Sequence, residues 1–371
     1  MSGELACFLS PDNGVLAHVR YIDIYRSSGI AEFDPISDFG LAVKLIIGAL
    51  PRNCLLGIRF GLKIDMFTLL SLLQSQQSLE AIEPRKIVSK DNSSLDLSLA
   101  THGSWVTPTL HNVRKLRVPI DDSDNDKNAH KNSAYLLKNT PNLRSLCLKG
   151  AYPIASLLDH TNEHDAFGGP YPDGAVVPTL QLDDLVLQWL DLSPSLASLL
   201  ACINFSGLRE LKVDECRNIA AFLNALVAEV PQATMLRKLK IAVHRRPAPS
   251  QGDIQAMEAV VFSAPSLEWV WLDVGRGRAL NVSCLAGHGK SLRNLTLMAC
   301  SKSQQPPHYT SSELDKLLNQ APNLETLAID LCPVSLGHAL LLGAKFKLPA
   351  QDGDESTLSE FTALMVCSLP P

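Results

Sequence analysis

The sequence predicts an α/β solenoid, a stack of strand–helix units with a parallel inner sheet and outer helices. Three observations predict it. A short apolar motif recurs along nearly the whole chain, segments with helical spacing of apolar residues lie between its copies, and a proline-containing tripeptide joins several of these segments to the next motif. Because one short strand and one helix cannot bury their apolar faces alone, such units fold only by stacking on one another.

The recurring motif, apolar-x-x-apolar-x-apolar, is typical of the strand of a leucine-rich repeat. Its copies follow one another at a mean spacing of about 31 residues between Leu116 and Leu364. This spacing predicts a leucine-rich-repeat horseshoe, a single domain over residues 1–371 with about 11–12 irregular repeats. The copies are Val19-Ile22-Ile24, Leu55-Ile58-Phe60, Val113-Leu116-Val118, Leu143-Leu146-Leu148, Leu182-Leu185-Leu187, Leu208-Leu211-Val213, Leu236-Leu239-Ile241, Leu267-Val270-Leu272, Leu292-Leu295-Leu297, Leu324-Leu327-Ile329 and Phe361-Leu364-Val366.

Three copies continue to a cysteine where a leucine-rich repeat carries Asn or Cys: Cys216, Cys300 and Cys332. A small, weakly polar side chain suits the buried turn at which the chain leaves the strand. Three cysteines in one register support the leucine-rich-repeat interpretation.

Helices are predicted between the strands. Their starts are expected at Asp65, at Asp253, and at Thr310 or Ser311 with Glu313, because these side chains can accept hydrogen bonds from the first helical N–H groups. Apolar residues recur at helical spacing in 66–73, 219–230, 254–262 and 314–318, and prolines that cannot continue a helix follow at Pro141, Pro231, Pro265 and Pro322. Three of these prolines begin a Pro-Asn/Ser-Leu tripeptide that opens the next repeat.

The repeat pattern weakens in three places. Residues 83–109, 119–133 and 160–178 are polar or rich in Gly and Pro, and we expect them to be loops or degenerate repeats.

Composition argues against several classes of protein. The chain has 33 basic and 38 acidic residues, a formal net charge of -5, which gives no electrostatic reason to expect nucleic acid or a membrane surface as partner. Its nine cysteines contain no C-x-x-C pair, which is typical of reduced thiols. The first residues, MSGELACFLS, lack the basic and apolar regions of a signal peptide. We therefore expect a cytoplasmic or nuclear protein that is not secreted.

The catalytic motifs are weak. His160-Thr-Asn-Glu-His164 matches the inverted zinc-protease pattern H-x-x-E-H, but Gly168, Gly169 and Pro170 follow where the helix that must present both ligands would continue. Gly289-Lys290-Ser291 resembles the end of a phosphate-binding loop, yet it precedes a predicted strand rather than a helix. We expect no enzyme, no cofactor and no metal. A metal-dependent hydrolase at His160 and His164 is the remote alternative.

The strand–helix units with P-N-L-x-x-L-x-L resemble the leucine-rich-repeat region of fungal F-box-type proteins. Leu16–Ile24 (LAHVRYIDI) is similar to the LA-x-x-VR-x-L-x-I segment that often opens this region after the F-box. The resemblance covers nearly the whole chain but concerns the repeat region only, since no F-box motif precedes Leu16. It implies the substrate-recognition module of a ubiquitin ligase, with a ligase adaptor as a further partner. The alternative is a stand-alone scaffold or regulatory protein unrelated to ubiquitin.

In every repeat, the side chains that alternate with the core leucines point out of the concave face of the sheet. Trp269 and Trp271 share this face of one strand, and exposed tryptophans dominate the energetics of many protein interfaces. We therefore expect a protein partner to bind this face. The residues expected to contact it are Tyr21, Tyr25, Lys149, Gln188, Lys212, Asp214, Lys240, Trp269, Trp271 and Asp273.

Overall fold

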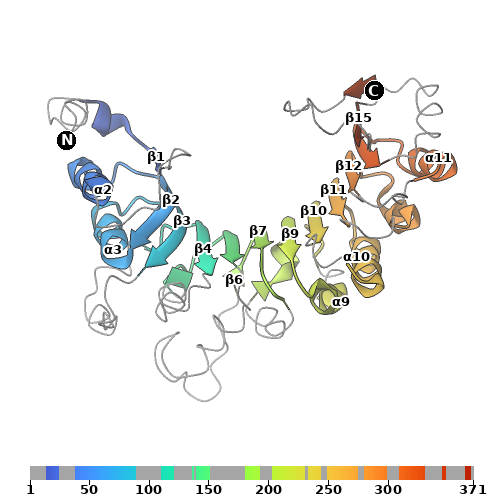
Figure 1. Ribbon diagram of the computed structural model, residues 1–371, viewed down its shortest axis with the longest axis horizontal. Helices are drawn as coiled ribbons and strands as arrows, with labels where there is room; N and C mark the ends of the chain where they lie inside the picture. The colour runs from blue at the N-terminus through green and yellow to red at the C-terminus, as the bar shows by residue number, and fades with distance from the viewer. Residues whose placement is uncertain are drawn as a thin grey trace, which may run out of the picture. The chain divides into compact units, whose positions relative to one another are not determined.

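The computed structural model shows a mixed α/β protein built from parallel strands with helices beside them (Figure 1). The chain divides into two compact units, Met1–Gln181 (unit 1) and Leu182–Pro371 (unit 2). The structure describes residues 14–24, 38–88, 110–120, 136–137, 139–150, 180–192, 203–229, 233–243, 249–274, 280–298, 309–330, 345–347 and 364–368.

In the described part of unit 1, five strands form a parallel sheet in chain order. They are β1 (Tyr21–Ile24), β2 (Gly57–Asp65), β3 (Ala81–Val88), β4 (Lys115–Ile120) and β5 (Ser145–Gly150). The helices α2 (Asp38–Ala49) and α3 (Met66–Ser75) lie on one side of these strands (Figure 1). The 3-10 helix η1 (Gly14–His18) precedes the sheet, and the short strand β6 (Leu180–Gln181) follows it in the chain.

In the described part of unit 2, six strands form a parallel sheet, again in chain order. They are β7 (Asp184–Gln188), β9 (Glu210–Cys216), β10 (Lys238–Val243), β11 (Trp269–Asp273), β12 (Asn294–Met298) and β13 (Thr326–Asp330). The helices α9 (Ile219–Glu229), α10 (Gln251–Ser263) and α11 (Ser311–Gln320) and the 3-10 helix η4 (Val282–His288) all lie on one side of it (Figure 1). The short elements β8 (Ile203–Asn204) and η2 (Phe205–Gly207) precede β9.

The motif leucines form the core as the sequence predicts. Leu211 and Leu239 are direct partners on β9 and β10, and Leu295 and Leu327 are direct partners on β12 and β13, with Val270 of β11 between the two pairs. None of these five side chains is more than 3% exposed. The buried row runs between the sheet and its helices, so the other face of the sheet stays open to solvent or to a partner.

Main-chain hydrogen bonds join each strand–helix repeat to the next repeat in the same way. The N–H groups of Arg237 and Lys238 both donate to the carbonyl of Arg209, at 2.9 and 3.1 Å. In the next repeat, the N–H groups of Glu268 and Trp269 both donate to the carbonyl of Arg237, at 2.8 and 3.1 Å. This shared acceptor fixes the start of each strand against the unit before it.

The residue directly before the first leucine of a repeat, asparagine in two Pro-Asn-Leu tripeptides, adds a side-chain bond between successive repeats. The amide nitrogen of Asn142 donates to the carbonyl of His111 and that of Asn323 to the carbonyl of Lys290, each at 2.7 Å. At the same position of Lys290-Ser291-Leu292, which lacks the proline, Ser291 Oγ instead donates to the carbonyl of Leu267 at 2.9 Å. Both residue types therefore donate a hydrogen bond to a carbonyl group in the turn of the preceding repeat.

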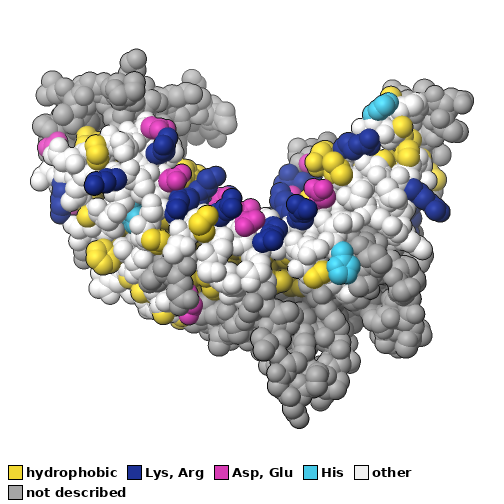
Figure 2. Space-filling view, turned by 180° about the vertical axis from the view of Figure 1, so that it is seen from behind, with side chains coloured by type: hydrophobic (Ala, Val, Ile, Leu, Met, Phe, Trp, Pro, Cys, Tyr) yellow, Lys and Arg dark blue, Asp and Glu magenta, His cyan; other side chains and the backbone are white. Residues whose placement is uncertain are grey.

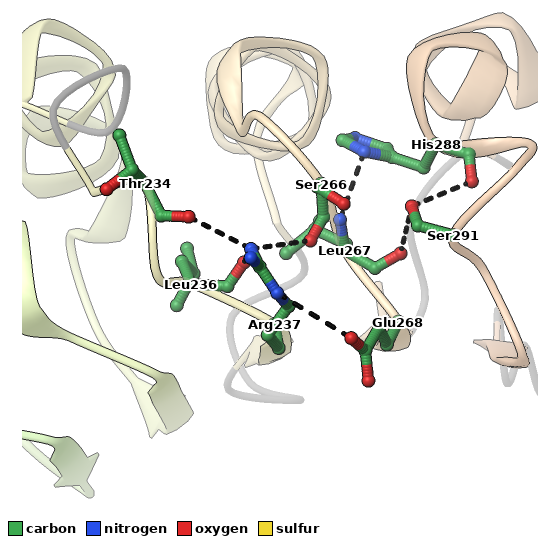
Figure 3. A network of polar contacts seen from close by, with 8 residues as sticks. All are labelled: Thr234, Leu236, Arg237, Ser266, Leu267, Glu268, His288 and Ser291. Atoms are coloured by element: carbon green, nitrogen blue, oxygen red, sulfur yellow. Dashed lines mark hydrogen bonds and ion pairs between the residues drawn. The ribbon is translucent and has the colours of Figure 1, made fainter.

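Arginine performs a similar role immediately before a strand. The Arg237 guanidinium donates to the carbonyls of Thr234, Leu236 and Ser266 at 3.0, 3.2 and 3.4 Å, and its Nε lies 3.6 Å from Glu268 Oε1 (Figure 3). In unit 1, Arg20 donates to the carbonyls of Ala17, Val19 and Cys54 in the same pattern. One side chain thus ties its own turn to the turn of the next unit.

Two expectations need correction. The copy at Phe361-Leu364-Val366 was expected to add another parallel strand, but β15 (Leu364–Ser368) runs antiparallel to β13, and β14 (Lys345–Lys347) runs antiparallel to β15. This copy lacks the Pro-Asn/Ser-Leu start that marks a helical crossover, which a parallel strand requires and an antiparallel strand does not. Helix α10 is capped by Ser250, with Asp253 as the reciprocal partner three residues inside the helix, rather than by Asp253 itself.

The weak regions of the repeat pattern fall mainly outside the described residues. In the first weak region, 83–109, residues 83–88 belong to β3 and 89–109 are not described. Pro119 and Ile120, at the start of 119–133, belong to β4, and 121–133 are not described. Residues 160–178 lie wholly outside the described part of the chain.

Candidate partner-binding face

The open face of the unit 2 sheet, which we call the tryptophan face, presents its side chains in three rows. Strand register aligns the residues of each row across neighbouring strands, because alternate residues of a strand point to the same side. The first row is Asp184, Glu210, Lys238, Trp269, Asn294 and Thr326; the second is Val186, Lys212, Lys240, Trp271, Thr296 and Ala328; the third is Gln188, Asp214, Ala242, Asp273 and Met298.

The two tryptophans pack against each other. The ring centroids of Trp269 and Trp271 lie 6.0 Å apart with an interplanar angle of 62°, an edge-to-face arrangement. Both side chains are half-buried rather than fully exposed, because they cover each other and Lys240 Nζ lies 4.8 Å from the centroid of Trp271. The pair is therefore held in one orientation before any partner arrives.

Charged neighbours fix this arrangement. Lys240 Nζ lies 3.0 Å from Asp214 Oδ1, and Gln188 Nε2 donates to Asp214 Oδ2 at 3.3 Å. Since Lys240 and Asp214 are both mostly shielded from water, their attraction is screened less than that of a fully exposed pair. A series of contacts from Gln188 through Asp214 and Lys240 to Trp271 thus orders the face across the four strands β7, β9, β10 and β11.

Trp271 also carries an unused donor. Its indole Nε1 is buried and has no hydrogen-bond partner within the described part of the chain. Buried polar groups are almost always hydrogen-bonded, and leaving one unpaired costs about 1–3 kcal/mol. An acceptor supplied by a bound partner would remove this cost once the side chains that cover the N–H move aside.

The β7–β9 half of the face is acidic and partly paired. Lys212 Nζ forms an ion pair with Glu210 Oε1 at 2.5 Å. Burial raises the pKa of Asp184 above its ordinary value, and the negative charges of Glu210 and Asp183 raise it further. The positive charges of Lys212 and Lys238 act to lower it. Lys238 is exposed and forms no ion pair with a described residue, so it is the cation on this face that is most available to a partner.

The expectation for Asp273 was wrong. Its side chain is aligned with the face between Ala242 and Met298, but it is only 7% exposed, so it cannot serve as an open contact point. Alternation along a strand gives the direction of a side chain and not how far its neighbours cover it. Gln188, Lys212, Asp214, Lys240, Trp269 and Trp271 all lie on the face as expected.

The remaining expected contacts lie elsewhere. Tyr21 and Lys149 belong to unit 1, where Tyr21 is 70% exposed and Lys149 is half-buried on β5. The Tyr21 ring lies over Gly57, since a Cβ at that glycine would meet Tyr21 Cδ1 at 2.7 Å. Tyr25 lies outside the described residues.

Two exposed aromatic residues were missed by the sequence reasoning. Trp189, 47% exposed, follows β7 with a positive φ of 57° and donates its indole N–H to Glu215 Oε2 at 3.1 Å. Phe262, 70% exposed, lies on α10. Its position falls off the buried stripe of Ile254, Met257 and Val261, so a helical-wheel projection would have shown it.

Figure 2 shows how charge is distributed over the molecule, with Lys and Arg side chains beside Asp and Glu side chains along the strands and apolar side chains between them. Cations and carboxylates are interspersed rather than segregated by sign.

The candidate catalytic groups have little structural support. Gly289 follows η4, and β12 begins at Asn294, so the Gly-Lys-Ser segment opens a strand and cannot act as a phosphate-binding loop. His160 and His164 lie outside the described residues, and within the described residues no group of three or more His, Cys, Asp or Glu side chains could hold a metal ion.

The described thiols are poor nucleophiles. Burial raises the pKa of Cys216 and that of Cys284 to about 12 in each case, which keeps both protonated at neutral pH. Cys216 Sγ donates to the carbonyl of Leu187 at 3.4 Å, in the preceding unit. This bond joins the end of β9 to the neighbouring strand β7; Cys300 and Cys332 lie outside the described residues.

No protein-family model matches this chain, and no curated protein sequence matches it. In the described ranges, no helix combines the length and the apolar character needed to cross a bilayer.

Proposed function

We propose that this chain is a leucine-rich-repeat protein that recognises a partner protein through the tryptophan face and performs no catalysis. The leucine-rich-repeat assignment is supported by the aligned core leucines, by the Asn and Ser bonds between units, and by the bond from Cys216 to the preceding unit. A sheet with helices on one side and an open face on the other leaves that face available for binding.

One observation carries the binding proposal: a preordered Trp269–Trp271 pair with a buried, unpaired indole N–H on an open sheet face. Preordered aromatic side chains bind at low entropic cost, and tryptophan is enriched among residues that dominate interface energies. Where binding moves the side chains that cover the N–H, a carbonyl or carboxylate of the partner completes its hydrogen bond.

The test begins with a partner isolated on the immobilised chain and identified by cross-linking, after which its Kd is measured by calorimetry. The double variant Trp269→Ala/Trp271→Ala should bind more than about tenfold more weakly, since loss of a hot spot costs about 2 kcal/mol or more. Trp271→Phe keeps an aromatic ring but loses the N–H, and it should show a smaller loss of about threefold to tenfold.

The matched control is Phe262→Ala, which removes an exposed aromatic side chain from helix α10 on the other side of the sheet. Its affinity should equal that of the original chain, and circular dichroism should show all variants folded. Unchanged affinity in the folded double tryptophan variant would reject the face assignment.

A narrower proposal, supported by the sequence resemblance around Leu16–Ile24, is that the partner is the substrate of a ubiquitin ligase. Co-precipitation with the ligase adaptor tests it, using this chain both alone and with any upstream coding sequence restored. Association supports the receptor role. Failure to associate in both forms favours a stand-alone scaffold or regulator with the same binding face.

A further inference from the structure

The open face of the unit 1 sheet has an excess of cations. On its described side chains, Arg59, Arg85, Lys115, Arg117 and Lys149 alternate with two carboxylates, Asp23 and Glu83. We call these five cations the basic face. Its charge contrasts with the net charge of the chain, which is -5, so it is a local feature and not a reflection of overall composition.

The two carboxylates are already engaged. Arg59 lies 3.8 Å from Asp23 and 3.8 Å from Glu83, and Glu83 also pairs with Lys115 Nζ at 2.5 Å. Arg117 forms no ion pair with any residue that the structure describes, although its side chain is half-buried. A half-buried guanidinium that lacks a carboxylate has more to gain from an incoming anion than a fully hydrated one.

The cations converge on the centre of β4 and β5. Cys147 is the direct partner of Arg117 across these strands. Burial raises the pKa of Cys147. Arg117 acts to lower this pKa, Glu83 acts to raise it, and Lys149 and Lys115 lower it by smaller amounts. Three cations are therefore near enough to one point on the sheet to act on the same side chain.

We propose that the basic face docks an acidic polypeptide segment, rich in Asp and Glu, which lies over β3 to β5 with its carboxylates at Arg117 and the adjacent cations. Charge complementarity carries this inference. Lys115 and Arg117 are two residues apart on β4, a separation of about 6.6 Å, and alternate side chains of an extended peptide repeat at the same distance. This surface and its ligand are separate from the tryptophan face and do not depend on it.

An acidic peptide fits better than a nucleic acid. Asp23 and Glu83 lie among the cations and would repel a continuous row of phosphates. Tyr21 is the one aromatic side chain among the described residues of this face, which leaves little surface on which bases could stack.

The test uses the full chain and a fluorescein-labelled peptide of alternating Glu and Ser, about ten residues long, with all carboxylates on one side when extended. Fluorescence anisotropy should show binding at low salt that weakens several-fold as the salt concentration approaches about 0.3 M, because the contacts are ionic. The same peptide with Gln in place of Glu should not bind.

Variants locate the contact. Arg117→Glu should weaken binding by about tenfold or more and Arg117→Gln by about threefold, since a charge-assisted hydrogen bond is lost in both and repulsion is added in the first. Arg52→Glu changes the net charge equally at an exposed turn before β2, away from the face, and should change the Kd by less than about twofold. The double variant Trp269→Ala/Trp271→Ala should bind the peptide normally, which separates this inference from the proposed function.

Three results would overturn the inference. They are the absence of peptide binding at low salt, equal weakening by Arg117→Glu and Arg52→Glu, and tighter binding of a single-stranded oligonucleotide of equal charge. The last result would assign the face to nucleic acid instead.

Discussion

Gly289 lies where the turn after η4 meets the end of α11. A Cβ built at this position would lie 1.7 Å from the carbonyl oxygen of Gln320 and 2.9 Å from its carbonyl carbon. Both are backbone atoms, which cannot rotate away as the tip of a side chain can. The Gly289 backbone lies in the ordinary helical region, with φ at -52°, so glycine is required here for space and not for conformation.

Gly289→Ala should therefore lower the free energy of unfolding by at least about 2 kcal/mol, as expected for overpacking against rigid atoms. Urea titration followed by circular dichroism measures it. Gly287→Ala is the matched control, because nothing lies within 4 Å of a Cβ at Gly287. Equal stability of the two variants would show that α11 can shift to make room.

His288 is a buried histidine that bridges a helix and a strand start. Its Nε2 lies 2.7 Å from the carbonyl of Val261 on α10. Its Nδ1 accepts from the N–H of Leu267 at 3.3 Å, a contact that Figure 3 draws. This pattern needs a neutral ring with the proton on Nε2. Burial lowers the pKa of His288 below its ordinary value of 6.5, although the bond to Val261 acts in the opposite direction.

The lowered pKa predicts a loss of stability in acid. Below pH 6.5 the unfolded chain takes up a proton on this residue that the folded chain does not, so the free energy of unfolding falls as the pH decreases and is unaffected well above 6.5. The contribution is at most about 1.4 kcal/mol per pH unit. Urea titrations at several pH values should show that the free energy of unfolding depends less steeply on pH in His288→Gln than in the exposed control His111→Gln. Equal slopes in the two variants would contradict the assignment.

At the scale of the element, the Pro-Asn/Ser-Leu tripeptide that opens three of the repeats has a physical role at each position. Proline ends the helix, and the leucine fills the core. Asn donates to the preceding turn, as Ser291 does at the same position of a repeat that lacks the proline. The Arg or Glu that follows the leucine pairs with its neighbour in the adjacent repeat, as Arg293 does with Glu325 at 3.1 Å. The sequence signature is therefore a set of contacts between units, which explains why it recurs without constant spacing.

Asn142 provides a test of these contacts. Asn142→Ala removes the bond to the carbonyl of His111 and should cost about 0.5–1.5 kcal/mol of stability. Asn142→Ser should recover part of the loss, because serine at the same position of other units donates to a nearby carbonyl, as Ser78 does to Leu55 at 2.7 Å. Urea titration of the three proteins decides it, and a serine variant no more stable than the alanine variant would count against an exchangeable donor.

The elements that the sequence predicted and those that it missed differ in the strength of their local signal. Helices α3, α9, α10 and α11 cover the predicted segments, to within one residue at α9, since helical spacing of apolar residues marks all four and capping residues also mark α10 and α11. Strand β3 was left within a region of loops or degenerate repeats, because Pro84 stands where the motif has its last apolar residue. Pro84 has no N–H to give, and the β3–β4 pairs involve Ala81 and Ile82, before it.

At the scale of the whole molecule, a local period predicts which side of a sheet a residue faces but not what covers it there. The sequence correctly aligned Trp269, Trp271 and Asp214 on one face, yet Asp273 is buried and Lys240 partly covers Trp271. Contacts between different strands follow from the register of the sheet and cannot be predicted from any single repeat. The contacts from Asp214 to Lys240 and from Lys240 to Trp271 are examples. The same limit applies to β15, whose motif gives a strand but not its direction.

The reversed strand β15 has a consequence for self-association. A parallel stack leaves the main-chain groups of its last strand unpaired, and such an edge can recruit a strand from another molecule. Here β15 occupies that edge of β13, and the strand beyond it, β14, spans only Lys345–Lys347. Among the described residues, the edge open to another molecule on this side is therefore the three residues of β14, which limits the pairing of strands between molecules.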